Sequence, residues 1–236
     1  MSGFFHPDIV IDPQEEDTLR MGRYLDPVCK LCRREQIKLY LKGERCFSNK
    51  CPIDRDALPP GMHGTRRGKH SEYGLRLRHK QRLKRFYGVL EAQFRRYFKM
   101  ASRSVGNTGE QLLSIMERRL DNVVHRLGFA ISRNAARQMI VHGHILLNGR
   151  KCDIPSILLK PGDVIKVRPR EISLKLAREG LQKTGQLGLR IPDFLELTGT
   201  ADEPEGRMTR LPTRQDVDER ISDRVNEQLI IEIVTR

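Results

Sequence analysis

Four of the five cysteines lie close together, as Cys29-x2-Cys32 and Cys46-x4-Cys51, with thirteen residues between the two pairs. Two close pairs joined by a loop with turn-forming residues can bring four thiolates to the corners of a tetrahedron, which is the geometry that Zn(II) accepts. The same ligands suit an iron-sulfur cluster, so the pattern predicts a metal and leaves zinc and iron open. Four thiolates leave no coordination position for a substrate, and we therefore expect a structural metal.

Disulfides and a redox-active pair are the competing interpretations of these cysteines. Residues 1–20 lack the basic start, long apolar centre and cleavage site of a secretory signal. We therefore expect a cytoplasmic protein, in which thiols stay reduced unless a metal binds them. A thioredoxin-like pair would need a strand and a helix around Cys29, which the local pattern does not indicate. Cys152 stands alone and is expected to be a small buried residue on a strand.

The charge of the chain indicates the class of its partner. Lys and Arg number 44 against 30 Asp and Glu, which gives a formal net charge of +14 over 236 residues. A protein this basic is attracted to polyanions, and nucleic acid is the leading partner by composition. No apolar run approaches the roughly 20 residues that a membrane-spanning helix needs, so we expect no membrane partner.

The basic residues concentrate between Arg66 and Arg103, a segment with thirteen Lys or Arg and two acids. Apolar and aromatic residues recur there at helical spacing, and Ser71 is a favourable N-cap, so the pattern predicts two basic amphipathic helices. A face so rich in one sign of charge would repel itself unless something anionic covered it.

The following segment predicts a compact unit of two helices and a small sheet. Apolar residues at spacings of three and four predict one helix over 113–127, and Ser132 is a favourable N-cap for a second helix. The dipeptide Asn148-Gly149 predicts a hairpin turn, and a strand is expected over 164–167. These elements make a unit from about residue 111 to 170.

Asp121 lies in an Arg-Leu-Asp triplet that also surrounds the catalytic aspartate of a class of pseudouridine synthases. The regular helical spacing around it instead predicts a surface residue that forms salt bridges. An RNA-modifying enzyme therefore stands as the alternative function. The sequence contains no phosphate-binding Gly-rich loop, zinc-protease motif or nucleophile elbow, so we expect a protein without catalytic residues.

The remaining segments complete the predicted organisation. Residues 1–21 form an acidic leader that is expected to be flexible, and 22–65 contain the cysteines followed by an extended arm rich in Pro and Gly. Residues 171–183 predict a helix. The closing NEQLIIEIVTR, 226–236, predicts a strand because it is rich in β-branched residues.

The segment from Met116 to Val167 resembles the small RNA-binding module that is named after the fourth protein of the small ribosomal subunit. The resemblance extends in order through nearly all of 21–236. Outside the module, four segments of this sequence resemble the zinc-type bacterial form of that ribosomal protein family. They are MGRYLDPVCKLCRRE from Met21, LYLKGERC from Leu39, PPGMHG from Pro59 and VNEQLIIE from Val225.

The resemblance implies an α+β fold: a mostly helical domain with an inserted RNA-binding module, of two helices plus a small antiparallel sheet, and an N-terminal four-cysteine zinc knuckle. In this arrangement the module spans 109–170, and the basic helical domain of 66–108 is completed by 171–236.

The resemblance also implies a function. Members of the family are structural constituents of the small ribosomal subunit that bind 16S rRNA early, nucleate assembly of the subunit body, and contribute to translational accuracy and to the side where messenger RNA enters. The implied partners are 16S rRNA, messenger RNA and neighbouring small-subunit proteins, especially the fifth. An obligate homo-oligomer is not expected.

Recognition of such an RNA would use its shape, its phosphates and its 2′-hydroxyl groups. The affinity would fall as the salt concentration rises, because the release of counterions from the RNA is then less favourable. The predicted RNA-contacting residues are Arg66, Arg67, Lys69, Lys80, Arg82, Lys84 and Arg85 on the basic arm, and Arg133, Arg137, His142 and Lys151 on the module.

Overall fold

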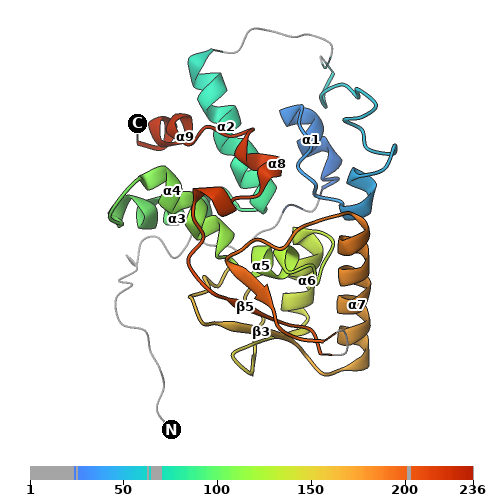
Figure 1. The fold of residues 1–236 in the computed structure, drawn as a ribbon. Helices are drawn as coiled ribbons and strands as arrows, with labels where there is room; N and C mark the ends of the chain where they lie inside the picture. The colour runs from blue at the N-terminus through green and yellow to red at the C-terminus, as the bar shows by residue number, and fades with distance from the viewer. Residues whose placement is uncertain (1–23, 25, 63, 65–70, 201–202, 236) are drawn as a thin grey trace.

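The computed structural model describes residues 24, 26–62, 64, 71–200 and 203–235, and Figure 1 shows two parts, a helical bundle and a sheet flanked by helices. The predicted leader and the candidates Arg66, Arg67 and Lys69 lie outside the described residues. No helix in the described ranges is both long and apolar enough to cross a bilayer. The helices are α1 (Cys29–Glu35), α2 (Glu72–Tyr87), α3 (Glu91–Arg103), α4 (Thr108–Glu117), α5 (Leu120–Arg126), α6 (Arg133–Val141), α7 (Glu171–Gln186), α8 (Glu219–Ser222) and α9 (Glu227–Thr235), with 3₁₀ turns η2 (Gly43–Cys46) and η3 (Arg214–Asp216).

The first hydrophobic core lies in the helical domain. The two basic helices predicted after residue 66 are confirmed as α2 and α3, and the Ser71 hydroxyl accepts a hydrogen bond from the Gly74 N–H at 3.2 Å. All their aromatic side chains except Tyr73, which is exposed on the first turn of α2, are buried and lie in the core of this domain, Phe86 and Phe94 completely. The aromatic residues between the arginines therefore serve packing, and the charged residues occupy the other faces.

The C-terminal segment is a helix, and the predicted strand is wrong. Asn226 Oδ1 accepts a hydrogen bond from the Gln228 N–H at 2.9 Å, which begins α9, and α9 lies against α2 and α4 (Figure 1). Ile230 is buried in the first core, with Val234 one turn later packed against it. The β-branched residues favoured a strand, but contact with a helical surface decided the structure.

The second core lies between a five-stranded antiparallel sheet and α5, α6 and α7. The sheet has the order β2-β1-β3-β5-β4, and the predicted hairpin is confirmed, with Leu147 paired to Arg150 across Asn148-Gly149. The predicted strand over 164–167 is also confirmed. The strands are β1 (Ile145–Leu147), β2 (Arg150–Lys151), β3 (Val164–Val167), β4 (Leu195–Leu197) and β5 (Glu205–Met208).

The module is larger than predicted, and its boundaries move. Strand β5 pairs with β3, Ile165 facing Gly206, and Ala177 of α7 lies in the second core. Residues 171–208 therefore belong to the module, whereas α4 packs in the first core. The chain returns to the helical domain only from Val217 onward. The segment that forms the second core therefore runs from about residue 118 to 208, between two segments of the first core.

The single helix predicted over 113–127 is interrupted at the junction of the two cores. Met116 belongs to the first core and Leu120 to the second. Between them, Arg119 is extended (ψ 137°) and pairs with Leu158, while the Leu120 N–H donates to the Ile157 carbonyl at 2.9 Å. Because the apolar residues keep helical spacing across the break, the periodicity could not reveal it.

Candidate nucleic-acid interface

A groove of about 790 Å³ runs between α2, α6 and the segment around the four cysteines, Cys29 to Cys51, which we call the cysteine segment. It brings together basic residues that are distant in sequence: Lys84 and Arg85 from the basic arm, and Arg133 and Arg137 from the module. Lys42, from the cysteine segment, completes the set. The described part of the lining has one carboxylate, Asp26, against these five cations, so the lining itself is basic. Four of the five also pair with carboxylates outside the lining: Lys84 with Glu91, Arg85 with Glu35, Arg133 with Asp218 and Arg137 with Asp121.

Two polar stripes form the facing walls of this groove. Gln81, Lys84 and Arg85 lie on α2 at positions i, i+3 and i+4. Asn134, Arg137 and Gln138 repeat the same spacing on α6. Residues at this spacing share one helix face. The sequence prediction missed Lys42 and the three amides, Gln81, Asn134 and Gln138. The repeated helical spacing could have indicated the amides, but not Lys42.

Arg133 supports the groove from inside rather than reaching out of it. Its side chain is only 6% exposed, and its guanidinium carbon lies 3.9 Å from the centroid of the Phe86 ring. Nη2 donates to Asp218 Oδ2 at 3.0 Å, and Nε donates to Asn122 Oδ1 at 2.8 Å. Its Nε and Nη2 donors are therefore committed to the protein, and its main role in the structure is to support the α6 wall of the groove.

The acids around Arg133 are held ionised by cations. Burial alone would raise the pKa of Asp218, but Arg133, Arg126 and Arg220 outweigh it and lower the pKa to about 2. Ser132 begins α6 by accepting a hydrogen bond from the Ala135 N–H at 3.3 Å, as predicted. The Arg133 contacts and the Ser132 cap together fix the N-terminal end of α6.

Much of the positive charge predicted for the basic arm is neutralised within the protein. Arg82 and Arg85 of α2 surround the buried carboxylate of Glu35, which also pairs with Arg78 at 2.9 Å. Lys80 pairs with Glu91 at 2.7 Å. Burial raises the pKa of Glu91, but hydrogen bonds from Lys80 and Lys84 outweigh it and hold the pKa at about 2. Lys80 and Arg82 are absent from the groove lining, so the structure does not place them with the other candidates.

His142 and Lys151 lie elsewhere on the module, beyond the C-terminal end of α6. Both are exposed, and Lys151 covers Gly143, where an added Cβ would come within 2.5 Å of Lys151 Cε. The His142 and His144 rings lie with their centroids 6.1 Å apart. These residues therefore form a second group beside α6, separate from the groove.

The cysteine segment contains four free thiols, three of them buried. Burial raises the pKa of the Cys32 thiol to about 11, and the other three cysteines of the segment contribute to the rise, so all four lie within electrostatic reach. The Lys42 N–H donates to Cys46 Sγ at 3.3 Å. Within the described residues, however, no three His, Cys, Asp or Glu side chains are arranged to hold a metal ion. The donor set is therefore the one that zinc uses, while the ligand arrangement is not preformed.

Besides the Glu35 pairs and the residues Leu39 and Leu41 in the first core, three contacts hold this segment against the module and α8. The guanidinium of Arg220 lies 4.8 Å from the centroid of the Tyr40 ring, and Lys183 Nζ lies 2.9 Å from Glu44 Oε1. Gly43 approaches Ile131 so closely that an added Cβ would be 2.8 Å from Ile131 Cδ1. The cysteine segment, α7 and α8 are therefore packed as neighbours.

Asp121 is buried, which corrects the prediction of a surface residue. It is 4% exposed, and Arg119 Nε donates to its Oδ1 at 2.9 Å. Arg119 Nη1 also donates to the Tyr97 hydroxyl at 2.8 Å. The salt bridge that was predicted is present, but it is internal. A carboxylate paired in this way is closed to a substrate and gives no support to the enzyme alternative.

The fold and the groove define a class of protein, in which a small α+β module with a basic face is inserted into a helical domain. Residues 23–117 match the family described as Ribosomal protein S4/S9 N-terminal domain, and residues 118–165 match the S4 domain. Similar proteins include the small ribosomal subunit protein uS4 of Halothermothrix orenii, 52% identical over 216 residues, and that of Thermus thermophilus, 49% identical over 217 residues. The uS4A protein of Symbiobacterium thermophilum is 51% identical over 219 residues. Each alignment covers 92% of this chain and 100% of the relative. The chain therefore belongs to the uS4 family of small ribosomal subunit proteins.

Proposed function

We propose that this protein is a structural constituent of the small ribosomal subunit in the cytoplasm and that it binds 16S rRNA through the groove between α2 and α6. The observation that carries the proposal is the meeting of two basic stripes, from segments about 50 residues apart, at one groove that also includes Lys42. Membership in the uS4 family, whose proteins are structural rather than catalytic, supports the same assignment.

The physical basis of this binding is phosphate neutralisation. Lys and Arg side chains release condensed counterions when they contact RNA phosphates, so the affinity falls as salt rises. The amides of Gln81 and Asn134 stand beside the cations and can donate to phosphate or 2′-hydroxyl oxygens, which reads the form of the RNA rather than its sequence.

Binding of 16S rRNA at several salt concentrations tests this proposal. We expect each of Lys42→Gln and Arg137→Gln to weaken binding. Each should also make the negative slope of log K against log salt less steep by about 0.7 to 0.9. Arg207→Gln, at an exposed position on β5 away from the groove, is the control and should leave the slope unchanged. Equal slopes for all four proteins would show that RNA does not use the groove.

We further propose the role that the family resemblance implies for the whole subunit: early binding that nucleates the body, contact with the fifth small-subunit protein, and a position on the side where messenger RNA enters, with an effect on accuracy. Reconstitution of the subunit from purified parts tests this role. Omission of the protein should arrest assembly before the fifth protein joins, and assembly that proceeds normally without it would contradict the role.

We also propose that the four cysteines bind one structural zinc ion that orders residues 22–55. The support is the spacing of the four cysteines and their presence as free thiols within one short segment. Elemental analysis should find one zinc per chain. Cys46→Ser should lose the metal and make this segment sensitive to protease, and Cys152→Ser should do neither. Iron with visible charge-transfer absorption would replace zinc by a cluster, and unchanged protease resistance would argue against a structural metal.

A further inference from the structure

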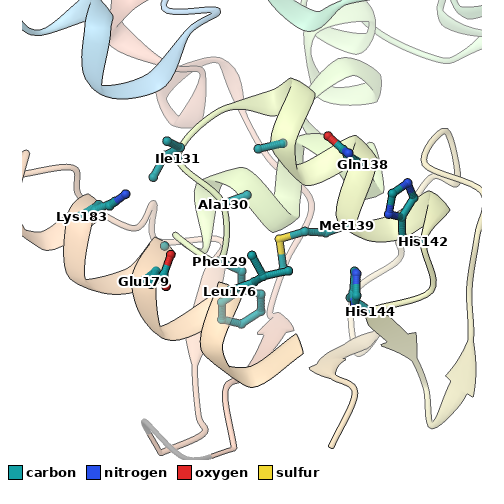
Figure 2. A pocket seen from close by; sticks show the side chains of 12 residues that line it. Phe129, Ala130, Ile131, Gln138, Met139, His142, His144, Leu176, Glu179 and Lys183 are labelled. Carbon is teal, nitrogen blue, oxygen red and sulfur yellow. The ribbon is translucent and has the colours of Figure 1, made fainter. Parts of the chain in front are cut away.

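A cavity of about 310 Å³ lies on the other side of α6, between the loop 128–131, α6 and α7 (Figure 2). Its volume falls in the range of small-molecule sites, roughly 300–1,000 Å³. Phe129, Met139 and Leu176 give it an apolar floor, while polar groups stand at its edge. One wall is fixed by backbone contact, because a Cβ at Gly180 would lie 2.3 Å from the Phe129 carbonyl oxygen.

The cavity and the basic groove share one lining residue. Gln138 lines both of them, because α6 separates the two and Gln138 sits at the boundary of its two faces. An RNA strand whose phosphates follow the groove therefore passes within one side chain of the cavity. A nucleotide at that point can direct its base toward the cavity while its backbone stays with the cations.

The polar edge of the cavity suits a base better than a phosphate. Figure 2 shows His142 and His144 on one side of the opening and Glu179 with Lys183 on the other. Lys183 is committed to Glu44 at 2.9 Å, and the carboxylate of Glu179 would repel an anion. The same carboxylate can accept a hydrogen bond from an exocyclic amino group, and an imidazole is one of the rings on which unpaired RNA bases stack.

From these observations we propose that the cavity between α6 and α7 holds one unpaired nucleobase of the RNA bound in the groove. The inference rests on the proposed RNA-binding function and adds a base-recognising subsite to it. Recognition of phosphates alone would be independent of sequence. The cavity therefore gives the protein a means to distinguish a strand that can present an unpaired base from a continuous duplex.

Filling the cavity tests the inference. Leu176 is 40% exposed on α7 and lines the cavity, so Leu176→Trp places a large ring in the opening without disturbing a buried core position. Ile172→Trp adds similar bulk one turn earlier on α7, at a position that is 71% exposed and outside the cavity lining. Ala135→Leu, from the α6 wall, is a second filling variant. Circular dichroism establishes that each variant is folded.

The readouts are affinity for 16S rRNA at fixed salt and base-specific chemical modification of the bound RNA. We expect wild type and Ile172→Trp to protect the same unpaired base. Leu176→Trp and Ala135→Leu should lose that protection and bind roughly tenfold more weakly, because the stacking of that base is lost. Protection and affinity that are equal in all four proteins would overturn the inference and leave the proposed function standing. Failure of the wild-type protein to bind would overturn both.

Discussion

Arg133 carries a full charge at a position that is 6% exposed, and its contacts explain how the interior tolerates it. The guanidinium lies over the Phe86 ring and donates to Asp218 and Asn122. A buried charge is costly unless it is paired and hydrogen-bonded, and here both conditions are met. The pair also joins the module to the segment that returns to the helical domain.

We expect Arg133→Met to lower the free energy of unfolding by about 3–5 kcal/mol, because it leaves Asp218 buried without its closest cation. Urea unfolding measures this loss. Arg95→Met is the control: this arginine is 74% exposed and its pair with Glu91 is a surface pair, so its removal should lower the same free energy by about 0.3–0.5 kcal/mol. Similar losses at the two positions would show that the internal pair contributes no more than a surface one.

Asp218 also gives the stability a definite pH dependence. Its pKa is about 2 in the folded protein, although burial alone would raise it, because Arg133 and Arg126 stabilise the carboxylate. A pKa lowered by folding stabilises the protein above the unfolded value of about 3.9, and this contribution is lost as the pH falls toward the folded value. The stability difference between wild type and Asp218→Asn should narrow by about 1 kcal/mol between pH 6 and pH 3. Parallel stability curves would contradict this.

At the scale of residues, the sequence indicated which side chains are charged but not which way they face. Arg133 and Arg137 lie four positions apart on α6 and both line the groove, yet the Arg133 side chain is 6% exposed and that of Arg137 is 26% exposed. The acid that decides the difference, Asp218, is 85 residues further along the chain. Asp121 was mistaken for a surface residue for the same reason, since its burial depends on Arg119 leaving the helix.

Among the elements, the cysteine segment depends on its fit against the module. Gly43 has φ +59° and faces Ile131, so this position requires both a left-handed backbone and the absence of a side chain. Leu39 and Leu41 anchor one side of the segment in the first core, while Gly43 and Tyr40 attach its other side to Ile131 and Arg220. These contacts together set how Lys42 faces the groove.

We expect Gly43→Ala to be more damaging than Gly88→Ala. Both glycines have a positive φ, +59° and +65°, so both variants carry backbone strain of about 1–2 kcal/mol. Only Gly43 adds a clash, because nothing lies within 4 Å of a Cβ at Gly88. The overpacking should cost about 1 kcal/mol more in urea unfolding, and protease should cut the cysteine segment faster. Equal losses would mean that the segment is not docked on Ile131.

The elements that the sequence predicted correctly are those with strong local signals. Ser71 and Ser132 begin their helices, and Asn148-Gly149 turns the hairpin, because each signal acts within four residues. The elements that were missed depend on distant contacts. Strands β4 and β5 are formed by pairing with β3 and with each other, and α9 is helical because it packs on α2 and α4.

In the whole molecule, two hydrophobic cores are joined by buried polar contacts. Arg119 links the module to Tyr97 of the helical domain, and Arg133 links α6 to Phe86 of α2. Breaking the two parts apart would remove the Tyr97 hydroxyl from Arg119 and the Phe86 ring from Arg133. The domain boundary could not be read from composition because the chain passes from one core to the other inside a single periodic segment, at Arg118 and Arg119.

We therefore expect the two cores to unfold together. All five tyrosines lie at or before residue 97 and the chain has no tryptophan, so tyrosine fluorescence reports on the helical domain and the cysteine segment. Far-ultraviolet circular dichroism reports on both cores. The two signals should give the same urea midpoint. A second dichroism step without a fluorescence change would show that the module unfolds independently.

The insertion of the module has a consequence for the order in which the protein is made. The module is complete once residue 208 is available, whereas the first core needs Val217, Ile221 and Ile230. Since synthesis proceeds from the N-terminus and domains fold as units, the helical domain begins first and closes last. The α2 wall of the groove thus gains its packing against α9 only when the final residues arrive. A chain that stops before α9 would leave the α2 wall of the groove without this packing, so the groove takes its final form only in the finished protein.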